Sequence, residues 1–228
     1  MSSASELSFI FDTDALAQIF ITGHQIILAH LKDQYGVSSY LMSEVEVELL
    51  SNRRISGLVR PRYEKALKNG WIKLLTSGDL ERVSKSIGIE VTLHEIRTLA
   101  SDLKLLIGNG EAHTHAAAIL LGCPSVSNDQ QAIRVLEANG KQMPSSVLRS
   151  FDLFGFCYHE HILSEREAEE IRTTLRGQGE WVPISMKNST FVGGLAAMAC
   201  RLSTSMAATQ SSAGWSGTFY LQRRSDTP

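Results

Sequence analysis

Short apolar runs alternate with longer stretches of helical spacing through most of the chain. Phe9-Ile10-Phe11 is one such run, and Asp12 ends it. The apolar residues that follow recur at helical spacings as far as Leu31, so a strand and then a helix are predicted. The same alternation predicts further strands at residues 37–41, 71–75 and 124–127. Strands that alternate with helices favour an α/β fold, here a three-layer α/β/α arrangement with a central parallel sheet.

Helix-start signals mark where some of the predicted helices begin. Ser43 and Glu46 have the spacing of a capping box, and Ser164 and Glu167 have the same spacing. In such a box the two side chains satisfy backbone N–H groups at the start of the helix. Later helices are predicted over residues 111–121, 129–139, 146–154 and 164–175.

The composition changes after Lys187. From Ser189 to Thr218 most residues are Ser, Thr, Ala or Gly, which offer little apolar surface to offset the entropy lost on ordering. We therefore predict one α/β domain over residues 5–187, including its C-terminal helices, and a weakly structured or partner-dependent low-complexity tail over residues 188–228. Apolar residues at spacings of three and four in the tail are consistent with an amphipathic helix that docks in a groove: Phe191, Leu195, Met198, Leu202 and Met206.

Charge and cysteine content exclude several classes of protein. The 22 basic and 24 acidic residues give a net charge of -2, so the whole chain has no general attraction for nucleic acid or anionic lipid. Cys123, Cys157 and Cys200 are far apart and lack metal-ligand spacing, which predicts neither a disulfide framework nor a zinc site. With no signal peptide or membrane span in the pattern, a cytoplasmic protein is expected.

Acidic residues stand at one predicted edge of the sheet. Asp12 follows the first strand and Asp129 follows the fourth, while Glu44 and Glu111 stand near helix starts. Ligands of open parallel sheets bind beyond the carboxyl ends of the strands. Converging carboxylates repel unless a cation or protons neutralise them, and oxygen ligands favour Mg²⁺ or Mn²⁺. Each acid alone also has a structural explanation, because the helix dipole favours acidic side chains in a first turn.

Four segments resemble, in order, the successive signatures of PIN-domain nucleases. They are Phe9-Ile10-Phe11-Asp12-Thr13-Asp14-Ala15-Leu16, the helix-start Glu44, Gly110-Glu111-Ala112 with Ala116-Ala117-Ala118-Ile119-Leu120, and Ser127-Asn128-Asp129-Gln130-Gln131-Ala132. Residues 147–181 are similar to the terminal helices of a PIN subgroup often encoded in bacterial and archaeal toxin–antitoxin loci. The resemblance covers about residues 7–185 and implies a PIN-like fold. Asn109, His113 and His115 depart from the usual pattern.

This resemblance implies a metal-dependent ribonuclease that hydrolyses RNA phosphodiester bonds, as the toxin of a toxin–antitoxin pair. Its partners would be an RNA substrate, an antitoxin protein and a second copy in a homodimer. The family's acidic positions fall on Asp12, Glu44, Glu111 and Asp129. Asp12, Glu111 and Asp129 are the expected ligands of Mg²⁺ or Mn²⁺, and Glu44 is expected to be a ligand or a base that positions water. Hydrogen bonds from Thr13 and Asn128 are expected to support them.

Positive charge is concentrated in one segment. From Arg53 to Lys73 there are seven Lys or Arg residues and one acid, Glu64. Arg53 and Arg54 follow the helix that begins near Glu44, so they are expected to contact RNA. A solvated helix face is the alternative explanation of such a run.

Two other functions stay open. One is a non-catalytic PIN-like module that binds RNA or a protein. The other is a haloacid-dehalogenase-like phosphatase, in which Asp12 would be the nucleophile and Asp14 an acid, but Leu16 stands where that pattern has Thr. In the nuclease interpretation Asp14 is expected to cap the following helix, and His115 is interpreted as a structural histidine.

Overall fold

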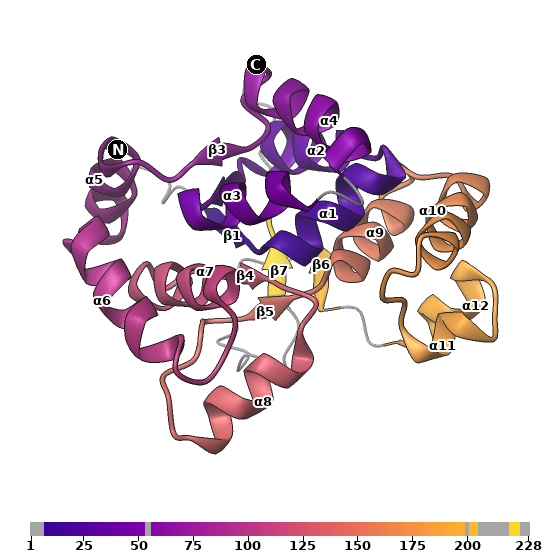
Figure 1. Cartoon of the computed structure of the whole chain (residues 1–228). Coiled ribbons are helices and arrows are strands. Elements are labelled where there is room, and N and C mark those ends of the chain that lie inside the picture. Colours follow the sequence, from indigo (N-terminus) through magenta and orange to yellow (C-terminus); the bar gives the residue numbers. More distant parts are fainter. Residues whose placement is uncertain (1–6, 53–55, 199–200, 205–218, 224–228) are drawn as a thin grey trace, which may run out of the picture.

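The computed structural model describes residues 7–52, 56–198, 201–204 and 219–223 (Figure 1). Five parallel strands form the central sheet in the order β3-β2-β1-β4-β5. They are β1 (Ser8–Phe11), β2 (Ser38–Leu41), β3 (Lys73–Leu74), β4 (Ser125–Val126) and β5 (Val147–Leu148). All four residues of the central β1 are buried, which explains why its apolar run does not alternate with polar residues.

Helices fill the connections that run from β1 to β3. They are α1 (Thr13–Thr22), α2 (Ile26–Tyr35), α3 (Ser43–Ser51) and α4 (Ser56–Lys68). The chain then crosses back over the sheet to β4 and β5. This return uses α5 (Ser77–Ile87), α6 (Leu93–Leu103), α7 (Asn109–Leu120) and α8 (Gln130–Ala138).

Helices flank the sheet on both sides, as the alternating pattern predicts. Figure 1 shows α2 and α4 toward the top of the view, beyond β1, and α8 below β5. This arrangement follows from the right-handed crossover rule, because connections that move in opposite directions along a sheet lie on opposite faces. The structure is therefore an α/β protein with a central parallel sheet, consistent with a three-layer fold. All four predicted strands are confirmed, at β1, β2, β3 and β4.

One predicted helix is partly wrong. Residues 146–154 begin instead with β5, and α9 (Ser150–His159) starts only after it. Val147 and Leu148 are fully buried beside β4, and because they lie just before α9 their two apolar positions do not stand out as a separate strand in the sequence. The correction adds a fifth strand at one edge of the sheet.

The two predicted capping boxes have different outcomes. Ser164 and Glu167 form one at the start of α10 (Glu165–Gly177), as predicted. The box expected from Ser43 and Glu46 is wrong, because Met42 is the N-cap residue of α3. The carboxylate of Glu46 instead accepts a hydrogen bond from the Tyr63 hydroxyl at 2.6 Å, which ties α3 to α4.

Part of the segment after Lys187 packs on the domain. This part contains α12 (Phe191–Ala196), β6 (Leu202–Thr204) and β7 (Phe219–Leu221), and it follows the short α11 (Ile184–Lys187). Its buried apolar side chains join the main core: Phe191, Leu195, Leu202 and Leu221. A low average content of apolar residues does not prevent this packing, because a few large side chains provide the burial. Residues 199–200, 205–218 and 224–228 of the predicted tail, Met206 among them, lie outside the described residues.

Within the described ranges, no helix combines the length and the hydropathy that a bilayer span requires.

Candidate active site

The strand order reverses beside β1, and this reversal defines a candidate site. The chain forms β2 and β3 on one side of β1 and then returns to form β4 on its other side. In open parallel sheets, ligands bind outside the carboxyl ends of the strands at such a point. Asp12 follows β1 directly, and Ser127 and Asp129 follow β4.

Asp12 is held between these two strands. Its backbone N–H donates to the Val126 carbonyl at 2.9 Å, and its Oδ2 accepts a hydrogen bond from the Ser127 hydroxyl at 3.3 Å. The side chain is only 2% exposed. The pKa of Asp12 is raised to about 7, mainly by burial and also by the charges of Asp14 and Glu48. The influences that lower it are hydrogen bonds from Thr13 and Ser127.

Glu111 is the second acid with a strongly raised pKa. It lies in the first turn of α7, where its Oε2 accepts a hydrogen bond from the Gly108 N–H at 3.3 Å. Burial raises the pKa of Glu111 to about 8, and the charges of Asp12 and Asp129 and a hydrogen bond with Asp129 add to the effect. Two of the sequence-predicted acids, Asp12 and Asp129, thus act electrostatically on the third, Glu111.

Asp129 has a fixed orientation because it caps α8. Its Oδ1 accepts hydrogen bonds from the N–H groups of Gln131 at 2.7 Å and Ala132 at 3.0 Å. Its own N–H donates to the Ser127 hydroxyl at 3.2 Å, so Ser127 contacts both aspartates. The cap leaves Oδ2 of Asp129 for other partners at this edge.

The structure corrects the expected role of Asp14. The N-cap residue of α1 is Asp12, so Asp14 lies within the first turn and is not the cap. Asp14 is exposed at the rim, and partial burial together with the charge of Asp129 raises its pKa. It therefore adds negative charge to the same edge.

Glu48 is a site residue that the sequence reasoning missed. Its Oε2 accepts a hydrogen bond from the Thr13 hydroxyl at 3.1 Å, and its charge raises the pKa of Asp12. A Cβ at position 110 would overlap Glu48 Oε2 and lie 3.4 Å from Asp12 Oδ1, so Gly110 leaves space for these carboxylates. The sequence feature that could have indicated Glu48 is its position, because it lies one helical turn after Glu44 on the same face of α3.

Glu44 has different partners. Its Oε1 lies 3.6 Å from His113 Nε2 and 3.6 Å from Arg97 Nε. Burial raises the pKa of Glu44, but hydrogen bonds from its own N–H and from Ser43, with the nearby His113 and Arg97, outweigh burial and lower it. Glu44 is thus held as an anion by α6 and α7, unlike the acids around Asp12.

Other polar residues predicted near the acids have separate contacts. Asn128 Oδ1 accepts a hydrogen bond from the Ser150 N–H at 3.0 Å, so its side chain fixes the start of α9. His115 is fully buried, its Nδ1 lies 3.2 Å from Ser125 Oγ, and burial lowers its pKa to about 4. It is a neutral core residue beneath the site.

The basic segment divides into two parts. Arg53 and Arg54, the expected RNA contacts, lie outside the described residues. Arg62 is structural, because its Nη1 donates to the carbonyls of Phe20 at 2.5 Å and Ile21 at 2.7 Å at the end of α1. It therefore does not belong to a solvated face.

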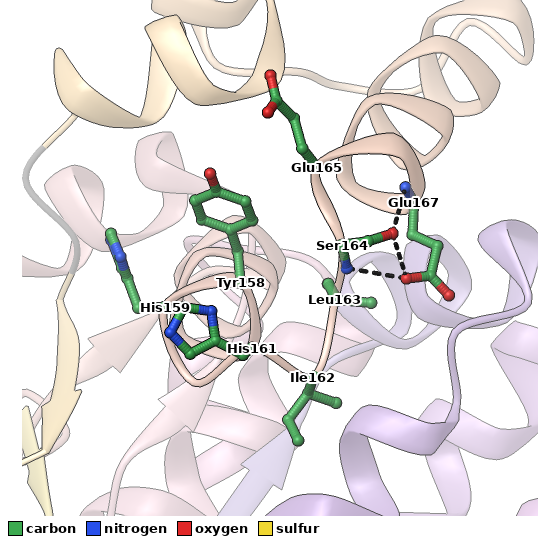
Figure 2. Close-up of a pocket in the computed structure, with 8 residues that line it drawn as sticks. All are labelled: Tyr158, His159, His161, Ile162, Leu163, Ser164, Glu165 and Glu167. Carbon is green, nitrogen blue, oxygen red and sulfur yellow. Dashed lines mark hydrogen bonds between the residues drawn. The ribbon is translucent and has the colours of Figure 1, made fainter.

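A separate open pocket of about 570 Å³ lies between the end of α9 and the start of α10. Figure 2 shows Tyr158, His159 and His161 on one side of it and the Ser164–Glu167 capping box on the other. The helix α9 begins at the carboxyl end of β5, and this pocket lies at the other end of α9. The pocket therefore does not include the acids around Asp12.

Chemically, the acids form an oxygen-only donor set. Among the described residues, no three His, Cys, Asp or Glu side chains are arranged, as they stand, to hold a metal ion. Burial is the main cause of the raised pKa values of Asp12 and Glu111, and neighbouring carboxylates raise both further. Such a set of carboxylates fits a hard divalent cation.

Comparisons with known proteins add no assignment. No protein-family model matches the chain, and no curated protein matches it.

Proposed function

We propose that the chain is a metal-dependent endoribonuclease of the PIN type that hydrolyses RNA phosphodiester bonds. The observation that carries the proposal is the group of interacting acids at the strand-order reversal, with the pKa of Asp12 raised to about 7 and that of Glu111 to about 8. Strongly perturbed carboxylates in such a position are candidates for function. The ordered resemblance of four segments to PIN nucleases supports the same conclusion.

Asp12, Glu111 and Asp129 are the residues proposed to hold Mg²⁺ or Mn²⁺, and Glu48 takes the role first expected of Glu44. The bound ion would lower the pKa of a water molecule and neutralise charge on the leaving oxygen. Other residues of the chain hold these carboxylates in position. Ser127 orients Asp12, Thr13 orients Glu48, and the α8 cap fixes Asp129. Ligands held in this way need little reorganisation.

The first test is cleavage of RNA by purified protein with Mg²⁺ or Mn²⁺ and with a chelator. Cleavage should require the ion, and Asp12→Asn or Asp129→Asn should abolish it while leaving the unfolding transition cooperative. Cleavage that persists in both variants would indicate another site or a contaminating nuclease.

Glu48 and Glu44 provide a matched pair on α3, one turn apart. Glu48→Gln is expected to lose most of the activity, because Glu48 contacts Thr13 and raises the pKa of Asp12. Glu44→Gln is expected to keep most of it, because its partners are His113 and Arg97. The opposite ranking would return the role to Glu44.

The toxin role, with an antitoxin partner and a homodimer, is part of the proposal. Expression of the wild-type chain is expected to arrest growth and Asp12→Asn is not. Mass measured in solution gives the oligomeric state. Equal growth with both chains would remove the toxin role while leaving the nuclease proposal in place.

A non-catalytic RNA-binding module is the second candidate. It is favoured by one observation, that no three acids of the described chain are grouped to hold an ion as they stand. RNA binding without cleavage in Mg²⁺ and in Mn²⁺ would support it. An aspartyl-phosphate trapped on Asp12 would instead support the phosphatase alternative.

A further inference from the structure

Trp181 is a large aromatic side chain that the proposed reaction does not use. It lies in the turn between α10 and α11 and is 38% exposed. Ile184, three residues further on, is 81% exposed. Trp181 and Ile184 are thus two large apolar side chains, close in sequence, that the core does not cover.

A chain of hydrogen bonds ties the Trp181 backbone to the acid edge. Gln18 Nε2 donates to the Trp181 carbonyl at 2.8 Å, and Gln18 Oε1 accepts from the Ser150 hydroxyl at 2.6 Å. The Ser150 N–H then donates to Asn128 Oδ1 at 3.0 Å, and Asn128 directly precedes Asp129. Gln18, Ser150 and Asn128 are all buried, so solvent does not compete for these bonds.

The indole ring of Trp181 also packs against the aromatic core. It packs edge to face on Phe151, with ring centroids 5.8 Å apart and an interplanar angle of 82°. Phe151 is itself fully buried against Phe154 and Phe191. The ring is therefore held in place before any ligand arrives, which reduces the entropy lost on binding.

Two cations flank Trp181 in the sequence. Arg176 precedes it by five residues and Lys187 follows it by six; both are exposed, and Glu180 is the only acid between them. Proteins that bind single-stranded nucleic acid combine cations for the phosphates with an aromatic face for the bases. This charge pattern favours an RNA occupant over an apolar protein segment.

We propose that Trp181 stacks on an unpaired base of the substrate and so positions the RNA strand beside the acids. The role of the neighbouring acids rests on the proposed function, but the stacking itself is a binding event. Gln18, Ser150 and Asn128 are positioning residues, because they act on the substrate only through Trp181 and the start of α9.

The experiment measures RNA binding without cleavage. Trp71→Phe and Trp215→Phe leave Trp181 as the remaining tryptophan of the three in the chain. In EDTA, a short single-stranded RNA should quench its fluorescence, and a duplex of the same sequence should do so much less. A continuous duplex offers no unpaired base to the ring.

Two matched variants separate stacking from apolar packing. Trp181→Phe keeps an aromatic face and should bind the single strand nearly as well as the wild type. Trp181→Leu keeps an apolar side chain without the ring and should bind about tenfold more weakly, the size typical of one lost stack. Urea unfolding of each variant shows whether the domain is folded.

The outcomes also distinguish this inference from the nuclease proposal. Quenching and weaker binding by Trp181→Leu, in a protein that cleaves no RNA with Mg²⁺ or Mn²⁺, would sustain stacking and refute catalysis. No quenching, with equal affinity of the Phe and Leu variants, would overturn the inference and leave Trp181 and Ile184 to a protein partner, whether or not RNA is cleaved.

Discussion

At the scale of single residues, a substitution of Gly110 is expected to reduce activity without reducing stability. A methyl group there would overlap Glu48 Oε2 and lie 3.1 Å from Thr13 Oγ1, both of them ends of side chains that can move. Gly110→Ala is therefore expected to leave the fold intact, and even to stabilise α7 by up to ~1 kcal/mol because alanine favours a helix. Displacing Glu48 by about 1 Å should reduce RNA cleavage by about a hundredfold. Single-turnover cleavage and urea unfolding measure the two effects.

Gly177→Ala is the control for this substitution. Gly177 is also helical, at the end of α10, and no atom lies within 4 Å of the position that its Cβ would take. It should retain wild-type cleavage. Equal activity of the Gly110 and Gly177 variants would show that Glu48 tolerates displacement.

Asp12 should destabilise the metal-free protein at alkaline pH. Its pKa is raised from 3.8 to about 7, so the folded protein binds this proton more tightly than the unfolded chain does. The resulting stability is complete below the unfolded pKa and is lost as pH rises through the folded pKa. In EDTA at pH 8, Asp12→Asn is expected to be more stable than the wild type by about 2–4 kcal/mol.

Unfolding in urea at several pH values checks this prediction for Asp12. The advantage of Asp12→Asn should decrease by about 2 kcal/mol at pH 5, where the wild-type carboxyl is protonated in the fold. If Asp12→Asn is less stable than the wild type at both pH values, the ionised Asp12 carboxylate does not destabilise the fold.

At the scale of elements, α7 contains a group with the opposite pH dependence. Burial lowers the pKa of His115 from 6.5 to about 4, so the unfolded chain takes up a proton that the fold resists. Stability is therefore lost as pH falls from about 6.5 toward 4. His115→Asn should lose about 2 kcal/mol less than the wild type between pH 7 and pH 5.

Most of the alternation of strands and helices could be predicted from periodicity. The runs around β1 to β4 indicate strands, although β3 and β4 have only two residues each. The two-residue β5 is missed because Val147 and Leu148 lie just before α9, so the pattern of residues 146–154 predicts a helix. Ser43 has the right spacing for a cap, yet Met42 takes that place because the chain leaves β2 one residue earlier than the motif requires.

The site residues that could be predicted from the sequence are those whose positions follow from strand order alone. Asp12 and Asp129 follow neighbouring strands, and this adjacency is a property of the α/β pattern. Spacing along a helix does not distinguish Glu44 from Glu48, because both lie on one face of α3. Glu48, and not Glu44, lies beside Thr13 and Gly110, and these neighbours are too distant in sequence for spacing to reveal them.

At the scale of the whole molecule, the chain after Lys187 contributes to the core. Each fully buried apolar side chain stabilises a fold by ~1.5–3 kcal/mol, and a typical domain has only ~5–15 kcal/mol in total. Phe191, Leu195, Leu202 and Leu221 are all buried in the core. A chain cut after Lys187 is therefore expected to lose at least half of its free energy of unfolding.

Urea unfolding of two truncated chains checks this prediction. A chain cut after Arg223 keeps β7 and the ion pair of Arg223 with Glu160, at 2.7 Å, and should unfold as the full chain does. If the chain cut after Lys187 has wild-type stability, the segment is dispensable to the fold.

The pairing of β1 with β4 also determines when a growing polypeptide can complete the candidate site. The hydroxyl that holds Asp12 belongs to Ser127, 115 residues later, and Ser127 directly follows β4, the strand that pairs with β1. A ribosome that stalls before this point releases a product with Asp12 and Glu111 but without the strand that aligns them. On the proposed function, such an unfinished chain is therefore expected not to cleave RNA.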